Sequence, residues 1–294
     1  RPWGNSEHPS APHLISIFPP HRPAAPACCW PVAGYFAKRK EAFFLMDRFE
    51  NKVVLITGAG DVAGAAAKRM MAEGARIAFA DFSQQALDQA AADLQAAGFS
   101  AERILCVQCD VRSMDSCRNA AEAVLEKWGQ IDTLLATAGI TRHMDIEEMT
   151  EKDWQDVVDI NLTGVYHACK AVVPAMRKRR YGHIVVISSI GGRTGRDVGV
   201  NYAATKAGVN GLVINLGYVL GPDGITVNSV APGPLKGKMF ASMDPERIKV
   251  LSGGIRLGRL GELDDIAAAV AYMGSDDAAW TTGEVLDVNG GLQY

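Results

Sequence analysis

The sequence has few aromatic residues, little net charge and no long hydrophobic run. Aromatic residues make up 7% of its 294 positions, and the formal net charge is −3 at pH 7. No apolar run reaches the roughly 18 residues that span a bilayer, so we expect no membrane partner. The chain has a mild acidic excess and no cluster of basic residues on a nucleic-acid-binding motif, so we expect no nucleic-acid partner. Because 48% of the residues are hydrophobic, a disordered chain is excluded and a folded core is predicted.

Cysteine is also too scarce to form the disulfide framework of a small secreted domain. The chain has six cysteines, and a chain of this length does not need disulfides to stabilise its core. Cys106 and Cys109 lie in an alternating, strand-like segment, RILCVQCD, which puts their side chains on opposite faces. No second cysteine or histidine pair follows at zinc spacing. We therefore expect reduced, buried thiols and no metal site, and we expect a cytoplasmic protein.

Proline is rare except at the start of the chain. Eight of the 13 prolines lie in the first 31 residues, and proline lacks the amide donor that helices and central strands need. We expect residues 1–45 to be a disordered, proline-rich extension, added upstream or by cloning; a transit peptide is the alternative. Residues 46–294 show no second break in composition, so they are expected to form a single domain.

From residue 52 onward, short β-branched runs alternate with helical stretches. Strands are predicted at residues 52–57, 75–80, 103–109, 133–136, 183–188, 225–230 and 285–288. Helices are predicted at residues 64–73, 83–97, 113–128, 152–179, 202–220 and 264–273. Most of the strand segments are continuously apolar, as buried parallel strands are. The alternation predicts an α/β fold, a doubly wound parallel sheet of about seven strands with helices on both faces.

The first predicted strand leads through a glycine-rich turn, TGAGDVAG, into a helix. Glycines there let backbone amides approach a pyrophosphate at the helix N-terminus, which makes residues 46–294 a dinucleotide-binding domain. Asp81 ends the next strand, where a carboxylate accepts hydrogen bonds from the adenosine ribose. A 2′-phosphate there would meet a like charge, at about 4 kcal/mol for a pair about 4 Å apart. We therefore predict NAD as the cofactor, with NADP less favoured.

Tyr202 and Lys206 are four residues apart in a predicted helix, so the phenol and the ammonium share one face. A neighbouring cation should lower the pKa of the phenol from about 10, which suits acid/base catalysis. Ser189 follows a predicted strand at the edge where doubly wound sheets hold ligands. Its hydroxyl could stabilise charge on a carbonyl oxygen. Each feature is common alone, and only their combination indicates a catalytic site.

With these motifs, the chain from about residue 50 onward resembles the short-chain dehydrogenase/reductase superfamily, in its single-domain branch. The resemblance implies that Ser189, and not its packing neighbour Ser188, is the catalytic serine. It also implies that Asn161 is a catalytic residue, together with Ser189, Tyr202 and Lys206. It also implies that Asp110 and Val111 contact adenine. The residues expected to bind the cofactor are Gly58, Asp61, Val62, Ala63, Gly64, Asp81, Phe82, Asp110, Val111, Thr137, Gly139, Tyr202, Lys206, Pro232 and Gly233.

Three positions depart from the pattern of this superfamily. Val62 stands where the middle glycine of the turn is usual, and Ala136-Thr137 replaces an asparagine pair. Gly237 stands where a threonine often binds the nicotinamide carboxamide. These departures motivate one alternative, a cofactor-binding protein with little catalysis.

The main interpretation is an enzyme, an NAD(H)-dependent oxidoreductase that interconverts a secondary alcohol and a ketone, with Tyr202 as acid and base. Its partner would be a small alcohol or ketone substrate, and Arg193 and Arg196 could hold an anionic one. The segments NYAATKAG and GITVNSVAPG most resemble 3-oxoacyl-[acyl-carrier-protein] reductases. That resemblance gives a second alternative, the same reduction with NADP(H), and the superfamily implies a homotetramer.

Overall fold

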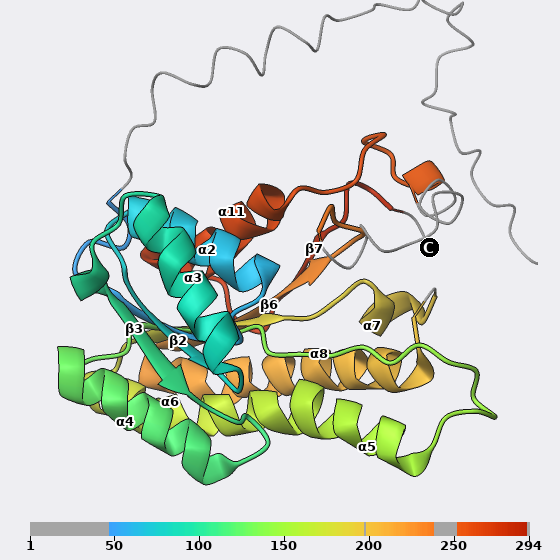
Figure 1. The fold of residues 1–294 in the computed structure, drawn as a ribbon, viewed down its shortest axis with the longest axis horizontal. Helices are drawn as coiled ribbons and strands as arrows, with labels where there is room; N and C mark the ends of the chain where they lie inside the picture. The colour runs from blue at the N-terminus through green and yellow to red at the C-terminus, as the bar shows by residue number, and fades with distance from the viewer. Residues whose placement is uncertain (1–46, 197, 238–251, 293–294) are drawn as a thin grey trace, which may run out of the picture. The chain divides into compact units, whose positions relative to one another are not determined.

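Seven strands form one parallel sheet in the order β3-β2-β1-β4-β5-β6-β7 (Figure 1). The structure is a computed structural model that describes residues 47–196, 198–237 and 252–292. The expected extension at residues 1–45 lies outside the described residues. The strands are β1 (Val53–Thr57), β2 (Arg76–Asp81), β3 (Ile104–Gln108), β4 (Thr133–Ala136), β5 (Gly182–Ile187), β6 (Ile225–Pro232) and β7 (Val285–Val288). Each neighbouring pair runs parallel, which confirms the predicted fold class.

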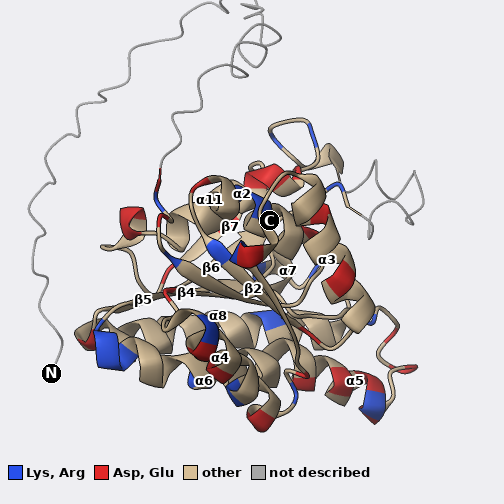
Figure 2. Ribbon diagram, turned by 60° about the vertical axis from the view of Figure 1, so that its left-hand side comes forward, with Lys and Arg blue, Asp and Glu red and all other residues tan. Residues whose placement is uncertain are grey.

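The strands at the middle of the sheet are apolar because helices cover both of their faces. All residues of β1, β4 and β5 are buried. Among the strands described, only Arg76, Asp81 and Asp287 carry a charge, and most charged residues lie on the helices and loops (Figure 2). Continuous burial of this kind is expected of a parallel sheet between two helical layers.

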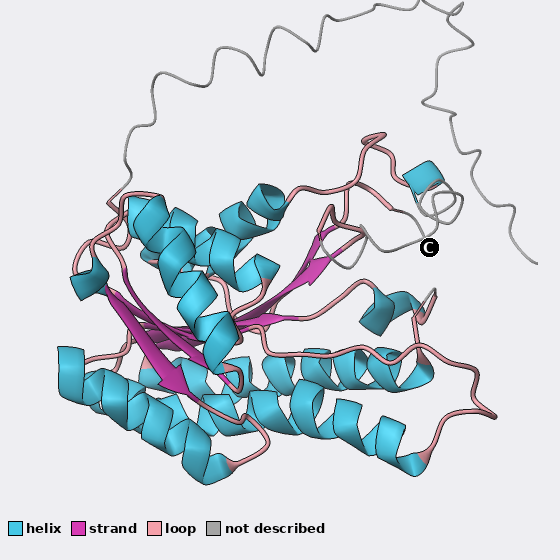
Figure 3. Cartoon of the chain, in the orientation of Figure 1, coloured by secondary structure: helices cyan, strands magenta, loops and turns pink. Residues whose placement is uncertain are grey.

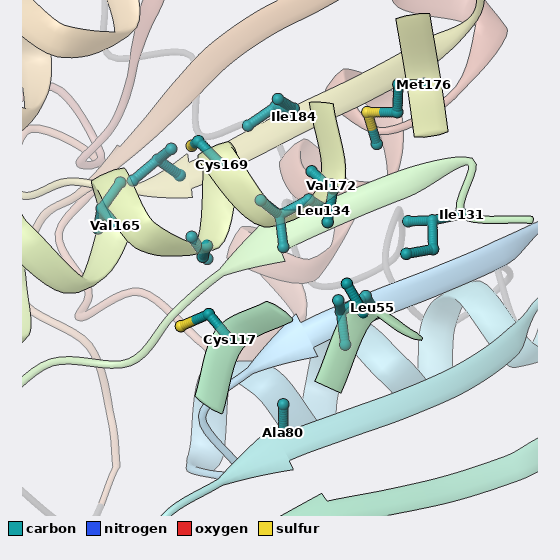
Figure 4. Packing of buried hydrophobic residues seen from close by; sticks show 14 of the residues in the cluster. Leu55, Ala80, Cys117, Ile131, Leu134, Val165, Cys169, Val172, Met176 and Ile184 are labelled. Atoms are coloured by element: carbon teal, nitrogen blue, oxygen red, sulfur yellow. The ribbon is translucent and has the colours of Figure 1, made fainter. Parts of the chain in front are cut away.

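One helical layer consists of α2 (Asp61–Ala72), α3 (Gln84–Ala96) and α11 (Leu263–Met273). The other contains α4 (Met114–Trp128), α6 (Gly164–Arg179) and α8 (Val200–Leu220), and Figure 3 shows helices on both sides of the sheet. Each layer packs against one face of the sheet and forms a separate hydrophobic cluster with the strands. In the cluster formed with α4, α6 and α8, side chains of α6 such as Cys169 and Val172 pack beside Leu134 of β4 (Figure 4). No helix within the described ranges is long and apolar enough to cross a bilayer.

The helix predicted at residues 152–179 is interrupted. It begins as α5 (Glu151–Val158), widens into a π-helical turn, η3 (Asp159–Thr163), and continues as α6. Its start is fixed by the Thr150 side chain, which accepts a hydrogen bond from the Asp153 amide. Isolated π-helical turns within α-helices are frequent at functional sites. The turn places Asn161 in the interior of the protein.

The order of the strands creates a topological switch point at their carboxyl ends, where a ligand-binding crevice is expected. β1 lies between β2 and β4, so the connections that leave β1 and β4 run to opposite sides of the sheet. Doubly wound sheets bind ligands at such a switch point. A short helix, α7 (Gly191–Thr194), follows β5 at this edge and packs against α8, although no sequence pattern predicted it.

Candidate active site

The turn between β1 and α2 has the shape that a dinucleotide pyrophosphate requires. Gly58 has a φ of +89°, and a Cβ there would lie 2.9 Å from Thr137 Oγ1 and 3.0 Å from the Ala138 amide nitrogen. Helix α2 begins after Gly60, whose cap position supplies no side-chain hydrogen bond. A Cβ added to Gly60 or Gly64 would meet no described atom within 4 Å. The turn thus leads into a helix N-terminus with open space beside Gly60 and Gly64, which fits the phosphate groups.

The departures at Val62 and Thr137 do not close this turn. The Val62 side chain is partly buried and packs against the hydrophobic cluster of α2, α3 and α11. Thr137 donates two hydrogen bonds to the Thr57 carbonyl, from its amide at 3.0 Å and from Oγ1 at 2.7 Å. The hydroxyl therefore joins the ends of β1 and β4, the strands that border the crevice.

Asp81 is fixed at the end of β2. One carboxylate oxygen accepts a hydrogen bond from the Ala59 amide and the other from the Ser83 amide, both at 2.8 Å. Its neighbour Phe82 is 65% exposed. The carboxylate is therefore held beside the glycine turn by the backbone on both sides, and a phosphate brought to this point would approach a fixed negative charge.

The residues expected at the adenine, Asp110 and Val111, follow β3, the strand beside β2. The Asp110 carboxylate pairs with Arg112 at 2.7 Å, and hydrogen bonds from Arg112 hold the pKa of Asp110 below its usual range. The Arg112 guanidinium also lies 5.9 Å from the centre of the Phe82 ring. The Val111 side chain is buried in the core, and its carbonyl lies 2.9 Å from Nδ1 of His167.

Ser189, Tyr202 and Lys206 come together at the carboxyl end of β5. Lys206 donates a hydrogen bond from Nζ to the Ile187 carbonyl at 2.7 Å, and Nζ lies 5.5 Å from the centre of the Tyr202 ring. The Ser189 side chain accepts a hydrogen bond from the Gly191 amide at 3.0 Å, and its interaction with the Tyr202 phenol lowers the pKa of that phenol. Two hydroxyls and one buried ammonium thus share one small volume.

Burial is the largest influence on the pKa values of Tyr202 and Lys206. It raises the pKa of Tyr202, and the hydrogen bond with Ser189 opposes the rise. Burial also lowers the pKa of Lys206 to about 8. The sequence-based expectation was that the ammonium would lower the pKa of the phenol, but Lys206 directs its ammonium at the Ile187 carbonyl. The phenol consequently holds its proton at neutral pH, as an acid that protonates an alkoxide must.

Asn161 connects the π-helical turn to the loop after β4. It is fully buried, its Oδ1 accepts a hydrogen bond from the Ile140 amide, and its Nδ2 donates one to the Ile140 carbonyl, both at 2.8 Å. A Cβ at Gly139 would lie 3.3 Å from Asn161 Oδ1 and 3.8 Å from Lys206 Nζ. The amide of Asn161 therefore lies close to the catalytic group and fixes the loop that borders it.

Pro232 and Gly233 are placed beside the same edge. The Pro232 carbonyl accepts a hydrogen bond from the Ile190 amide, and the Gly233 amide donates to the Val288 carbonyl, both at 3.0 Å. Gly237 is farther along, where a Cβ would lie 3.3 Å from a carboxylate oxygen of Asp61. The predicted residues from β1 to β6 thus lie at or just after the carboxyl ends of their strands, with Asp61, Val62, Ala63 and Gly64 in the first turn of α2.

Sequence reasoning missed the contribution of α7. A Cβ at Gly192 would lie 2.6 Å from the Lys206 carbonyl carbon, so this helix rests directly on the backbone of Lys206. It also missed the hydroxyl of Ser188, which donates a hydrogen bond to Asn210 Oδ1 at 2.6 Å. The double glycine at 191–192 is the one sequence signal for the close contact, because only glycine leaves room for it.

Comparisons with known proteins agree on one family. Residues 58–293 match a family described as enoyl-(acyl carrier protein) reductase. The 3-oxoacyl-[acyl-carrier-protein] reductase FabG of Thermotoga maritima is 35% identical over 246 residues, which are 83% of this chain and 99% of that protein. FabG of Escherichia coli is 36% identical over 245 residues, 83% of this chain and 98% of its own.

Solved structures also match the chain, at slightly lower sequence identity. The crystal structure of gox2181 superposes with a TM-score of 0.80 at 32% identity and covers 84% of this chain and 98% of that one. A 3-oxoacyl-[acyl-carrier protein] reductase from Brucella melitensis gives a TM-score of 0.79 at 31% identity, covering 84% and 93% of the two chains.

Proposed function

The chain belongs to the short-chain dehydrogenase/reductase superfamily, and from that premise we propose that it reduces a 3-oxoacyl thioester to the 3-hydroxyacyl thioester. Its family makes it an oxidoreductase of CH–OH and ketone groups that uses a nicotinamide dinucleotide. The relatives named 3-oxoacyl-[acyl-carrier-protein] reductases favour this substrate over an unspecified secondary alcohol. The observation that carries the proposal is the grouping of Ser189, Tyr202 and Lys206 at the end of β5, with the Lys206 ammonium 5.5 Å from the centre of the Tyr202 ring.

Each member of the group has a distinct role in the reduction. The Ser189 hydroxyl binds the ketone oxygen and stabilises the charge that develops on it. The Tyr202 phenol donates its proton to that oxygen, and the Lys206 ammonium would hold the nicotinamide ribose of the bound dinucleotide. Asn161 holds the loop after β4 in place through Ile140. When bound, the dinucleotide supplies the hydride.

We propose NAD(H) rather than NADP(H) as the cofactor. The proposal is supported by Asp81, whose carboxylate is fixed by the amides of Ala59 and Ser83 where the adenosine ribose would bind. A 2′-phosphate would have to approach this charge, whereas two ribose hydroxyls could donate hydrogen bonds to it. Titration of the protein with NADH and with NADPH, followed by fluorescence, should show tighter binding of NADH. Tighter binding of NADPH would overturn the assignment of Asp81 and leave the reduction itself untouched.

The substrate class is tested by a direct comparison of ketones. Acetoacetyl-coenzyme A should be reduced with a kcat/KM at least tenfold above that of simple ketones without a thioester, measured as loss of absorbance of whichever of NADH and NADPH binds more tightly. A simple ketone reduced equally well would favour the broader alcohol–ketone activity. Turnover of neither class would contradict the proposed reduction.

We also propose a homotetramer, by analogy with the family, and a cytoplasmic location. Large apolar side chains on the outer faces of α5 and α8 support the assembly, since Trp154, Ile214 and Tyr218 are 38%, 55% and 84% exposed. Light scattering of the purified protein should give about four times the chain mass, and a monomer would exclude this assembly. Cell fractionation tests the location.

A further inference from the structure

Helix α8 presents three side chains, one turn apart, to three consecutive residues at the end of β5. The Tyr202 phenol interacts with the Ser189 side chain, which lowers the pKa of the phenol, and the Lys206 ammonium donates to the Ile187 carbonyl at 2.7 Å. One turn further on, Asn210 Oδ1 accepts a hydrogen bond from the Ser188 hydroxyl at 2.6 Å. Residues four apart share a helix face, so these contacts form a ladder between α8 and the end of β5.

Ser188, which makes the third contact of this ladder, is also fixed by its burial and by its backbone. Ser188 is 1% exposed, and its amide donates to the Val230 carbonyl of β6 at 2.8 Å. Its hydroxyl lies 3.4 Å from the Lys206 carbonyl as well as 2.6 Å from Asn210. A buried hydroxyl that loses its acceptor is left unsatisfied, so this hydrogen bond resists breaking. Ser188 therefore ties β6, β5 and α8 together immediately before Ser189.

We infer that Asn210 is a positioning residue for the proposed reduction. By holding Ser188 on α8, Asn210 fixes the Ser189 hydroxyl against the Tyr202 phenol. Without this contact, the Ser188 hydroxyl keeps only the longer approach of 3.4 Å to the Lys206 carbonyl, and the end of β5 is held on α8 mainly by the flexible side chain of Lys206. Ser189 could then turn away from Tyr202. Misplacement of a reacting group by about 1 Å costs roughly 100-fold in rate, so a partial loss of alignment should be visible in kcat.

The matched pair Asn210→Leu and Asn210→Asp separates the acceptor from the bulk of the side chain. Leucine keeps a similar volume and removes the acceptor, whereas aspartate keeps an acceptor oxygen. Ser188→Ala removes the donor from the other side, and the double variant S188A/N210L completes the cycle. Asn119→Leu is the control, because it makes the same substitution at an exposed position of α4.

Kinetics with acetoacetyl-coenzyme A and NADH decide the inference. N210L and S188A should each lower kcat about tenfold, with the KM for NADH within about twofold of its original value. The double variant should lose no more than either single variant, because both remove the same contact. N210D should recover most of the kcat that N210L loses, and N119L should match the unmodified protein.

The pH profile gives a readout that general destabilisation would not move. A looser Ser189–Tyr202 contact removes an interaction that lowers the pKa of Tyr202, so the loss of kcat that follows deprotonation of Tyr202, at a pH above the pKa of about 8 of Lys206, should shift to higher pH in N210L. A kcat for N210L within about twofold of the unmodified protein would overturn the inference. So would losses that multiply in the double variant. If N210L does not fold, S188A decides alone by the same criteria. An unmodified protein without turnover would instead overturn the proposed function.

Discussion

Replacing Gly192 by alanine should disturb the catalytic group without replacing any of its side chains. Gly192 lies in α7, and a Cβ there would be 2.6 Å from the Lys206 carbonyl carbon and 2.9 Å from the Ala207 amide nitrogen. Ordinary contact begins at 3.4 Å, so α7 and α8 would have to separate by about 0.8 Å (3.4 − 2.6). Both contacts are to backbone atoms, which cannot turn aside as a flexible side chain could.

This separation has two measurable consequences. Overpacking of a well-packed contact costs about 1–3 kcal/mol, which lowers the Tm of a domain of this size by roughly 2–12 °C. The movement also carries Ser189, which is hydrogen-bonded to the Gly191 amide, away from α8. A displacement of nearly 1 Å should lower kcat by about 10- to 100-fold. Steady-state kinetics with acetoacetyl-coenzyme A and a thermal melt measure both.

Gly211→Ala is the matched control. Gly211 lies in α8, and a Cβ there would meet no described atom within 4 Å. Alanine in a helix interior is favoured over glycine by about 1 kcal/mol, so G211A should keep kcat and gain a little stability. If G192A and G211A were equally active and equally stable, the close contact between α7 and α8 would have no role in positioning the site.

Three further predictions concern charge and burial. Asp81→Ser removes the fixed carboxylate and should shift the ratio of NADPH to NADH affinity by about tenfold or more toward NADPH. Fluorescence titration measures this ratio, and an unchanged ratio would contradict the role of Asp81. Burial lowers the pKa of His183, so as the pH falls below about 6.5 the unfolded chain takes up a proton that the folded protein refuses. The free energy of unfolding should therefore fall with pH in that range, and urea titrations should show a flatter dependence for His183→Gln. Asn161→Ala leaves the buried backbone groups of Ile140 without their partners and should cost about 2–6 kcal/mol in urea unfolding, whereas a loss below about 1 kcal/mol would show that water replaces the amide.

The sheet could be predicted from the sequence because its strands are short apolar runs between turn residues. β4 (Thr133–Ala136) and β7 (Val285–Val288) have their predicted bounds, and β6 extends two residues further, to Pro232. A proline can end a strand because its carbonyl still accepts a hydrogen bond, here from Ile190. Local pattern was sufficient for these elements, since burial on both faces leaves a continuous signal.

The parts that the sequence did not predict depend on contacts between distant residues. Asn161 interrupts an apolar pattern, but the π-helical turn around it is fixed by hydrogen bonds to Ile140, 21 residues away. The four residues of α7 include two glycines and have no apolar periodicity. The pairing of Ser188 with Asn210 spans 22 residues and two elements. Such contacts follow from the packing of elements, so sequence spacing alone does not reveal them.

The central claim is that the Tyr202 phenol donates the proton in the reduction. Tyr202→Phe removes only the hydroxyl, and kcat should fall by about 100- to 10,000-fold, the usual contribution of a positioned acid. The affinity for NADH, measured by fluorescence titration of the same variant, should stay within about twofold. Turnover close to that of the unmodified protein, at unchanged NADH affinity, would contradict the account.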